Sequence, residues 1–67
     1  MRQSEIQVGK VYSNGRGLLR KVLVFPKQRP GARQDVSVRH LNGKYEGIAY
    51  SMLLKGFARW AKEEVTS

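Results

Sequence analysis

The amino-acid sequence predicts a mostly β fold, a small antiparallel barrel of four to five strands followed by a C-terminal α-helix. Three observations lead to this prediction. Short apolar runs of strand length are separated by turn signals, two of these turns are Asn-Gly pairs, and helical periodicity is confined to the end of the chain. With 67 residues, the chain has room for one domain, residues 1–67.

The first hairpin is predicted on both sides of Asn14-Gly15. A short strand is expected over residues 7–12, and residues 1–6 before it are polar and expected to be flexible. Asn-Gly between two apolar runs is a strong hairpin signal, because both residues tolerate positive φ. The second strand, residues 18–25, ends at Pro26 and is apolar on both faces, which is typical of a central strand.

The third strand is predicted over residues 35–41, where polar and apolar residues alternate. In this register Val36, Val38 and His40 share one face of the sheet. A second Asn-Gly turn, Asn42-Gly43, follows directly and predicts another hairpin. The sequence therefore favours an antiparallel sheet built from two hairpins.

The last elements are a fourth strand over residues 44–52, which extends the sheet over residues 7–52, and a helix over residues 54–64. Phe57 and Trp60 are spaced i,i+3, so both side chains lie on one helix face and are expected to dock onto the sheet. The simplest packing of these elements is an SH3-like or Tudor-like barrel with the helix covering one end.

Composition excludes several classes of protein. The chain has no cysteine, so a disulfide scaffold, a thiolate metal site and a cysteine nucleophile are all impossible. His40 is its single histidine, and no serine or acid is placed by sequence to complete a catalytic triad with it. No paired carboxylates or metal-ligand cluster follow from the spacing. We therefore expect a non-enzymatic protein without a cofactor or a metal, and without a membrane span, in the cytoplasm.

Charge gives the main functional signal. The chain has 13 Lys and Arg against 5 Asp and Glu, a net charge of +8. Such a surplus attracts polyanions and predicts nucleic-acid binding through the backbone or a groove, with DNA ahead of RNA. The candidate binding residues are three groups of cations in or beside the turns, together with one adjacent tyrosine: Arg16, Arg20 and Lys21; Lys27, Arg29 and Arg33; Arg39, Lys44 and Tyr45.

The tyrosines distinguish this hypothesis from its alternative, a protein-interaction adaptor with an SH3-like surface. A continuous stripe of cations that contains one or more tyrosines would indicate nucleic acid, because stacking on bases requires exposed rings among cations. A groove of tyrosines separated from the cations would instead fit a peptide or protein partner. The chain has Tyr12, Tyr45 and Tyr50, and each could also be a packing residue between strands. A monomer is expected, or a weak homodimer formed through an open sheet edge.

Three segments carry a resemblance to known proteins: GKVYSNGRGLLRKVLVF, VSVRHLNGKYEG and KGFARWAKEEV. Together they resemble small uncharacterised proteins of phages, prophages and mobile elements. The resemblance implies an SH3-like sheet, a mobile-element origin and, for the adaptor alternative, a host or phage protein as partner. The loop Gln28-Arg29-Pro30-Gly31 is also similar to the arm tip of the HU and IHF family, which inserts proline-bearing ribbons into the DNA minor groove.

Overall fold

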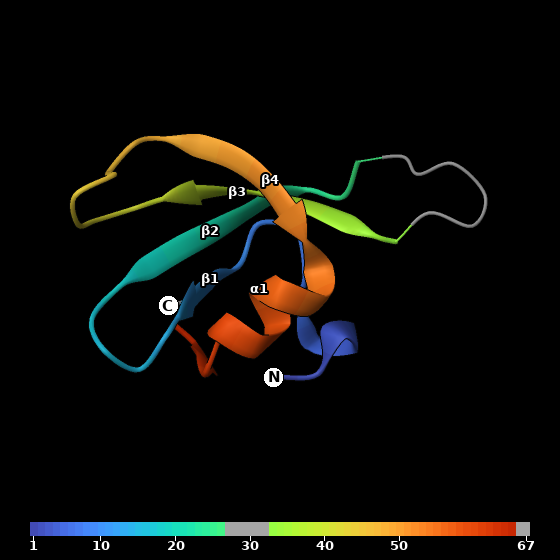
Figure 1. Ribbon diagram of the computed structural model, residues 1–67. Helices are drawn as coiled ribbons and strands as arrows, with labels where there is room; N and C mark the ends of the chain where they lie inside the picture. The colour runs from blue at the N-terminus through green and yellow to red at the C-terminus, as the bar shows by residue number, and fades with distance from the viewer. Residues whose placement is uncertain (27–32, 66–67) are drawn as a thin grey trace.

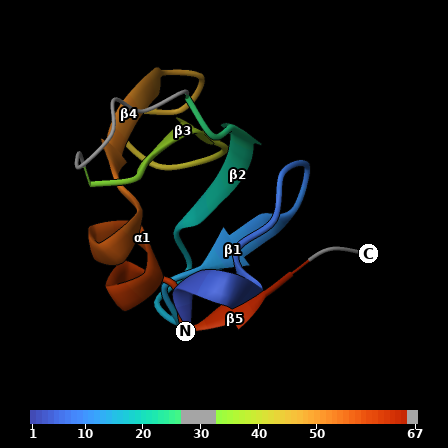
Figure 2. The same ribbon diagram turned by 90° about the vertical axis from the view of Figure 1, so that its right-hand side faces the viewer.

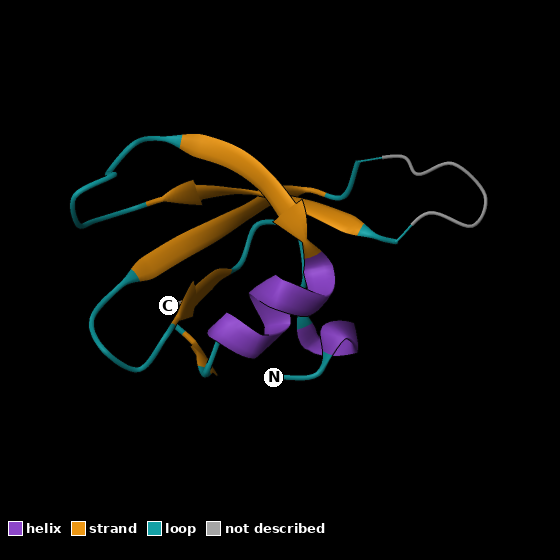
Figure 3. Cartoon of the chain, in the orientation of Figure 1, coloured by secondary structure: helices purple, strands orange, loops and turns teal. Residues whose placement is uncertain are grey.

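Five antiparallel strands form one open sheet in the order β4-β3-β2-β1-β5 (Figure 1), in a computed structural model that describes residues 1–26 and 33–65. The elements along the chain are η1 (Gln3–Glu5), β1 (Val11–Ser13), β2 (Leu19–Val24), β3 (Asp35–His40), β4 (Ala49–Leu53), α1 (Leu54–Trp60) and β5 (Glu63–Glu64). α1 follows β4 directly along the chain, and Figure 3 shows the helices in purple and the strands in orange. The predicted mostly β fold of four to five antiparallel strands with a C-terminal helix is confirmed, and the strands form an open, bent sheet.

The first hairpin joins β1 to β2, as predicted, and β2 is a central strand between β1 and β3. The Asn14 side chain stabilises the turn by accepting two backbone hydrogen bonds, at 2.7 and 3.2 Å. Gly15 has φ of 80°, a conformation that glycine adopts without a steric penalty. β1 begins at Val11, later than the predicted range 7–12, because the residues before it form a turn.

The second hairpin is longer than predicted. Its fourth strand begins at Ala49 rather than within the first residues of the expected range 44–52. Residues 43–48 form consecutive turns instead, and the backbone N–H of Ile48 donates to the carbonyl of Tyr45 at 3.0 Å. These local hydrogen bonds take the place of the first hydrogen bonds predicted between β3 and the fourth strand. The loop therefore extends beyond the end of β3.

The helix is shorter than predicted. It ends at Trp60 rather than at residue 64, and Glu63–Glu64 form strand β5 against β1. The backbone N–H of Lys62 donates to the carbonyl of Ser13 at 2.7 Å. Without β5, one edge of β1 would lack backbone partners, and this pairing outweighs the further helical turn that the sequence pattern predicted.

The N-terminal residues are packed against α1, whereas the sequence predicted a flexible segment over residues 1–6. They form η1, and Ile6 is buried in the core. The amino group of Met1 donates to the carbonyls of Ala58 and Ala61 at 2.9 and 3.1 Å. These two carbonyls lie at the C-terminal end of α1, where backbone acceptors have no partner within the helix.

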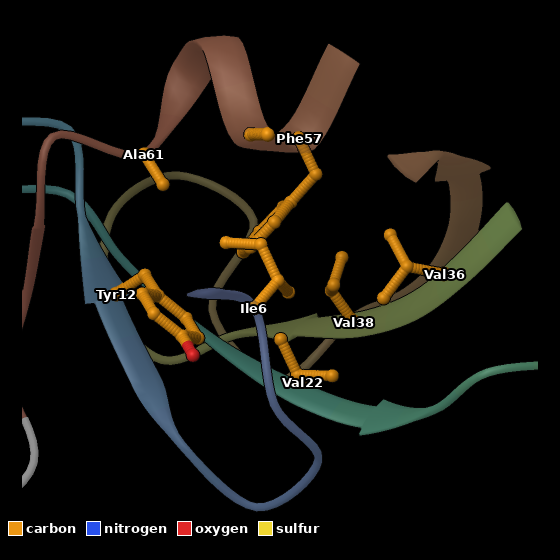
Figure 4. Close-up of a cluster of buried hydrophobic side chains, with 8 residues drawn as sticks. Ile6, Tyr12, Val22, Val36, Val38, Phe57 and Ala61 are labelled. Carbon is orange, nitrogen blue, oxygen red and sulfur yellow. The ribbon is translucent and has the colours of Figure 1, made fainter. Parts of the chain in front are cut away.

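The sheet bends around α1, which leads from the edge strand β4 to the opposite edge strand β5 (Figure 2). The helix therefore covers the open side of the sheet. The buried apolar side chains face this space (Figure 4) and are Ile6, Tyr12, Val22, Val36, Val38, Phe57, Ala58 and Ala61. The rings of Tyr12 and Phe57 meet edge to face with centroids 5.7 Å apart. Trp60 is only half-buried and packs at the margin of this core.

Candidate functional site

Strand register places polar and aromatic side chains beside the core on the inner face of the sheet. Tyr12 is opposite Arg20, and Arg20 is opposite His40, so the three side chains form one row across β1, β2 and β3. Tyr50 joins the same face because it is opposite the buried Val38. Tyr12 belongs to the core, whereas Arg20, His40 and Tyr50 are only partly buried.

These partly buried side chains form a continuous series of ring and cation contacts. The His40 ring lies 5.6 Å from the Tyr45 ring and stacks on Tyr50 at 4.9 Å, with an interplanar angle of 24°. The Arg20 guanidinium carbon lies 5.6 Å from the centre of the Tyr50 ring and 4.2 Å from that of Trp60. We refer to Arg20, His40, Tyr45, Tyr50 and Trp60 as the aromatic strip.

Arg20 is held in the aromatic strip by rings, without a carboxylate. Its Nη1 lies 3.9 Å from the Met52 sulfur, a weak acceptor, and its buried Nε has no hydrogen-bond partner in the described part of the chain. Within residues 1–26 and 33–65, the one ion pair joins Lys10 to Glu64. The positive charge of Arg20 is thus stabilised by cation–π contacts but is not neutralised.

Tyr45 forms the exposed end of the aromatic strip. Its side chain lies on the loop between β3 and β4 and is 54 % exposed. The Nζ atom of Lys44 lies 5.7 Å from the centre of the ring, the pairing of ring and cation that the sequence predicted. A large exposed aromatic ring supported by other rings and flanked by a cation is the arrangement on which a nucleic-acid base can stack.

Asn42 ties the two hairpin loops together. Its Nδ2 donates to the carbonyl of Gly17 at 2.8 Å, and its Oδ1 accepts the backbone N–H of Leu19 at 3.0 Å. The loops at residues 14–18 and 41–48 therefore lie at the same end of the sheet (Figure 1), which brings Arg16 and Lys44 to that end. The sequence identified Asn42 only as a turn residue and gave no signal for this contact.

The remaining candidate cations do not join the aromatic strip. Lys21 and Arg39 are opposite each other on the outer face, because successive strand residues point to opposite sides of a sheet. Arg33 is exposed just before β3, at the end of that strand opposite to the hairpin loops. Lys27 and Arg29 lie outside the described residues, as does the tip of their loop. The described candidate cations thus lie in three separate places.

The three tyrosines have different roles. Tyr12 is fully buried, and its hydroxyl accepts the N–H of Gln7 at 2.8 Å and donates to the carbonyl of Glu5 at 2.9 Å. Tyr45 and Tyr50 belong to the aromatic strip, beside cations. These two rings are not separated from cations as the rings of a peptide-binding groove would be, but the candidate cations do not form the continuous stripe that the sequence criterion requires for nucleic acid.

The positive charge in and beside the aromatic strip comes from Arg20 and Lys44. Burial lowers the pKa of His40 below its usual 6.5, and the charge of Arg20 lowers it further, so the ring is neutral at pH 7. Burial raises the pKa of the Tyr50 hydroxyl, although Arg20 acts in the opposite direction. Arg20 and Lys44 therefore provide the positive charge that an incoming anion would meet.

Sequence reasoning missed two members of the aromatic strip, His40 and Trp60. His40 was considered only for a catalytic triad, Trp60 was expected to dock onto the sheet as a core residue, and Tyr50 was left open between stacking and packing. The alternation that put His40 on the face of Val36 and Val38 did contain a signal, because a polar ring on an inner face requires a partner. Helical periodicity could not show that Trp60 covers an arginine.

Comparisons with known proteins identify no relative, so the function of this chain must be argued from the geometry of its candidate site. No protein-family model, no curated protein and no solved structure matches this chain. The resemblance to phage, prophage and mobile-element proteins therefore stays a prediction. In the part of the chain that the structure describes, neither helix has the length and apolar character needed to cross a bilayer.

Proposed function

We propose that this protein binds nucleic acid, DNA ahead of RNA, through the aromatic strip and the cations of the two hairpin loops. The observation that supports this proposal best is the placement of Tyr45 and Tyr50 among Lys44 and Arg20, with no carboxylate paired to either cation in the described residues. Phosphates would supply the missing negative charge, and their binding would release counterions.

The direct test is a salt titration of DNA binding by fluorescence anisotropy. The affinity should be highest at about 50 mM salt and should fall steeply by about 200 mM, because each phosphate contact releases counterions. RNA of the same sequence should bind more weakly than DNA. Absence of binding at about 50 mM salt would overturn the proposal, since the counterion contribution is large there.

A matched pair of double variants locates the surface. Arg16→Ala with Lys44→Ala removes two charges from the hairpin loops beside the aromatic strip. Lys21→Ala with Arg39→Ala removes the same charge from the outer face. The first variant should reduce the steepness of the log-affinity against log-salt plot by about two, because each of the two cations would bind one phosphate, and the second should change it less. Equal effects would argue against the strip as the binding surface.

A protein-interaction adaptor is the second candidate, and the open edge at β4 favours it. Among the described residues, β4 pairs with β3 along one edge, and no strand pairs with its other edge. Ile48, just before β4, and Leu53, its last residue, are 52 % and 41 % exposed. Such an edge can accept a strand from a partner or form a weak homodimer. Strand pairing and apolar contacts would persist at about 500 mM salt, where phosphate contacts are greatly weakened.

A further inference from the structure

We infer that the aromatic strip binds unpaired bases, so that single-stranded nucleic acid is the preferred form of the polymer. This inference rests on the proposed nucleic-acid binding and specifies which form of the ligand the site accepts. Three features support it: the exposure of Tyr45, the rings behind it, and the positions of the nearby cations.

Tyr45 offers a ring surface that a base can cover only when the base is unstacked. More than half of its side chain is exposed, at the end of the aromatic strip. In a duplex, each internal base is already covered on both faces by its neighbours, so this surface stays empty. In a single strand, a base can turn out of the chain and stack on the ring without breaking a base pair.

The rings behind Tyr45 reduce the entropy that binding would cost. Tyr45 contacts His40 at 5.6 Å, and His40 stacks on the partly buried Tyr50 at 4.9 Å. The stacking surface is therefore supported by a strand of the sheet, although Tyr45 itself lies on a loop. A side chain that is held in place before binding loses less freedom when a ligand covers it.

Cations at the same end of the sheet as Tyr45 would be available to the phosphates of a stacked nucleotide. Lys44 is 5.7 Å from the ring, and Asn42 ties in the neighbouring loop that carries Arg16. The outer face differs, because Lys21 and Arg39 lie opposite each other without a ring contact in the described structure. Charge alone can hold a duplex backbone there, whereas the strip combines charge with a place for a base.

The experiment compares three DNA probes of equal phosphate number at one salt concentration. They are a single strand, the same strand with abasic sites in place of its nucleotides' bases, and a duplex closed at both ends by base-free linkers, so that it neither frays nor offers unpaired bases. The single strand should bind most tightly. The abasic strand presents similar phosphates without rings and therefore measures the contribution of the backbone alone.

Two variants of Tyr45 connect this preference to the strip. Tyr45→Ala should weaken single-strand binding by about 5- to 150-fold, the range expected when one stacked base no longer has its ring, and should leave abasic-strand binding unchanged. Tyr45→Phe retains the ring and should bind like the original protein. Because Tyr45 is outside the core, all three proteins should give the same thermal melting curve, which excludes unfolding as the cause.

The outcomes separate this inference from the proposed function. A preference for the single strand that disappears in Tyr45→Ala and is retained in Tyr45→Phe supports the inference. Equal binding of all three probes, unaffected by Tyr45→Ala, overturns it but leaves nucleic-acid binding in place as a backbone interaction. If none of the probes binds, both the inference and the proposed function are wrong.

Discussion

Two neighbouring parts of the molecule, the core half and the aromatic strip, use similar aromatic side chains for different purposes. In the core half, the Tyr12 and Phe57 rings meet edge to face, both fully buried, and the Tyr12 hydroxyl has two backbone partners. In the aromatic strip, Tyr45 also contacts a ring, that of His40, yet most of it is exposed. The difference shows that coverage by α1 and the N-terminal segment, rather than residue type, separates a packing tyrosine from one available to a ligand.

The largest effect is expected from Phe57→Ala, which tests whether the core half carries the stability of the domain. Removal of this buried ring should lower the free energy of unfolding by about 3–5 kcal/mol. That is a large part of the total for a small domain. Urea unfolding followed by circular dichroism measures it. Tyr45→Ala is the control and should cost less than about 0.5 kcal/mol, since its ring is outside the core.

A smaller effect is expected when the hydroxyl oxygen is removed from Tyr12 and, for comparison, from Tyr45. Tyr12→Phe deprives the N–H of Gln7 and the carbonyl of Glu5 of a hydrogen-bond partner and should cost about 1–3 kcal/mol. Tyr45→Phe should be close to neutral, because its hydroxyl is on an exposed side chain. Equal decreases in stability in the two variants would contradict the division between core and strip.

The contact between Arg20 and Trp60 lies where the two halves meet and is measured by a double-mutant cycle. Arg20→Met, Trp60→Leu and the double variant should reveal a coupling free energy of about 0.5–2 kcal/mol from the cation–π contact at 4.2 Å. The cycle removes the effects of each substitution on general packing. A coupling near zero would mean that the ring does not stabilise the charge.

The smallest effect is a dependence of stability on pH that arises in the strip. Because the pKa of His40 is lowered in the folded state, the unfolded chain binds the proton more readily. The contribution of His40 to stability is therefore fully present above pH 6.5 and is lost as pH falls below 6.5 toward the folded-state pKa. Arg20 faces the ring as a charge, while Tyr45 and Tyr50 contact it as rings.

Melting curves between about pH 7.5 and about pH 5 measure this dependence. His40 is the only histidine in the chain, so His40→Gln removes histidine titration altogether and provides the control. The variant should lose less stability than the original protein over this range. Parallel curves for the two proteins would show that His40 is not shielded from solvent by the strip.

Much of the fold could be predicted from local sequence signals. The Asn-Gly turn after β1 depends on backbone preferences of the residues themselves, and the inward direction of Val36 and Val38 follows from the two-residue period of a strand. Element ends were less predictable. The helix pattern continued past Trp60, but the unpaired edge of β1 competed for Glu63–Glu64, and this competition exists only after the chain has folded.

Part of the candidate site was predictable as well. Tyr45 and Lys44 were identified together because neighbours in sequence remain neighbours in the loop. The position of Arg20 was not predictable in the same way. Its contacts with Tyr50 and Trp60 join residues 30 or more positions apart, and they arise from strand pairing and helix docking.

By itself, the sequence determined a small, basic, mostly β chain with two Asn-Gly turns, because composition, turn chemistry and periodicity act locally. The tertiary structure alone decided which cations share a face. In the folded chain, Arg20 contacts the rings, whereas Lys21 lies on the other face of the sheet. The hydrogen bond from the Asn42 side chain to the carbonyl of Gly17 holds the two hairpin loops together. The physical reason is that charge is a property of single residues, whereas a binding surface is a property of the contacts between strands.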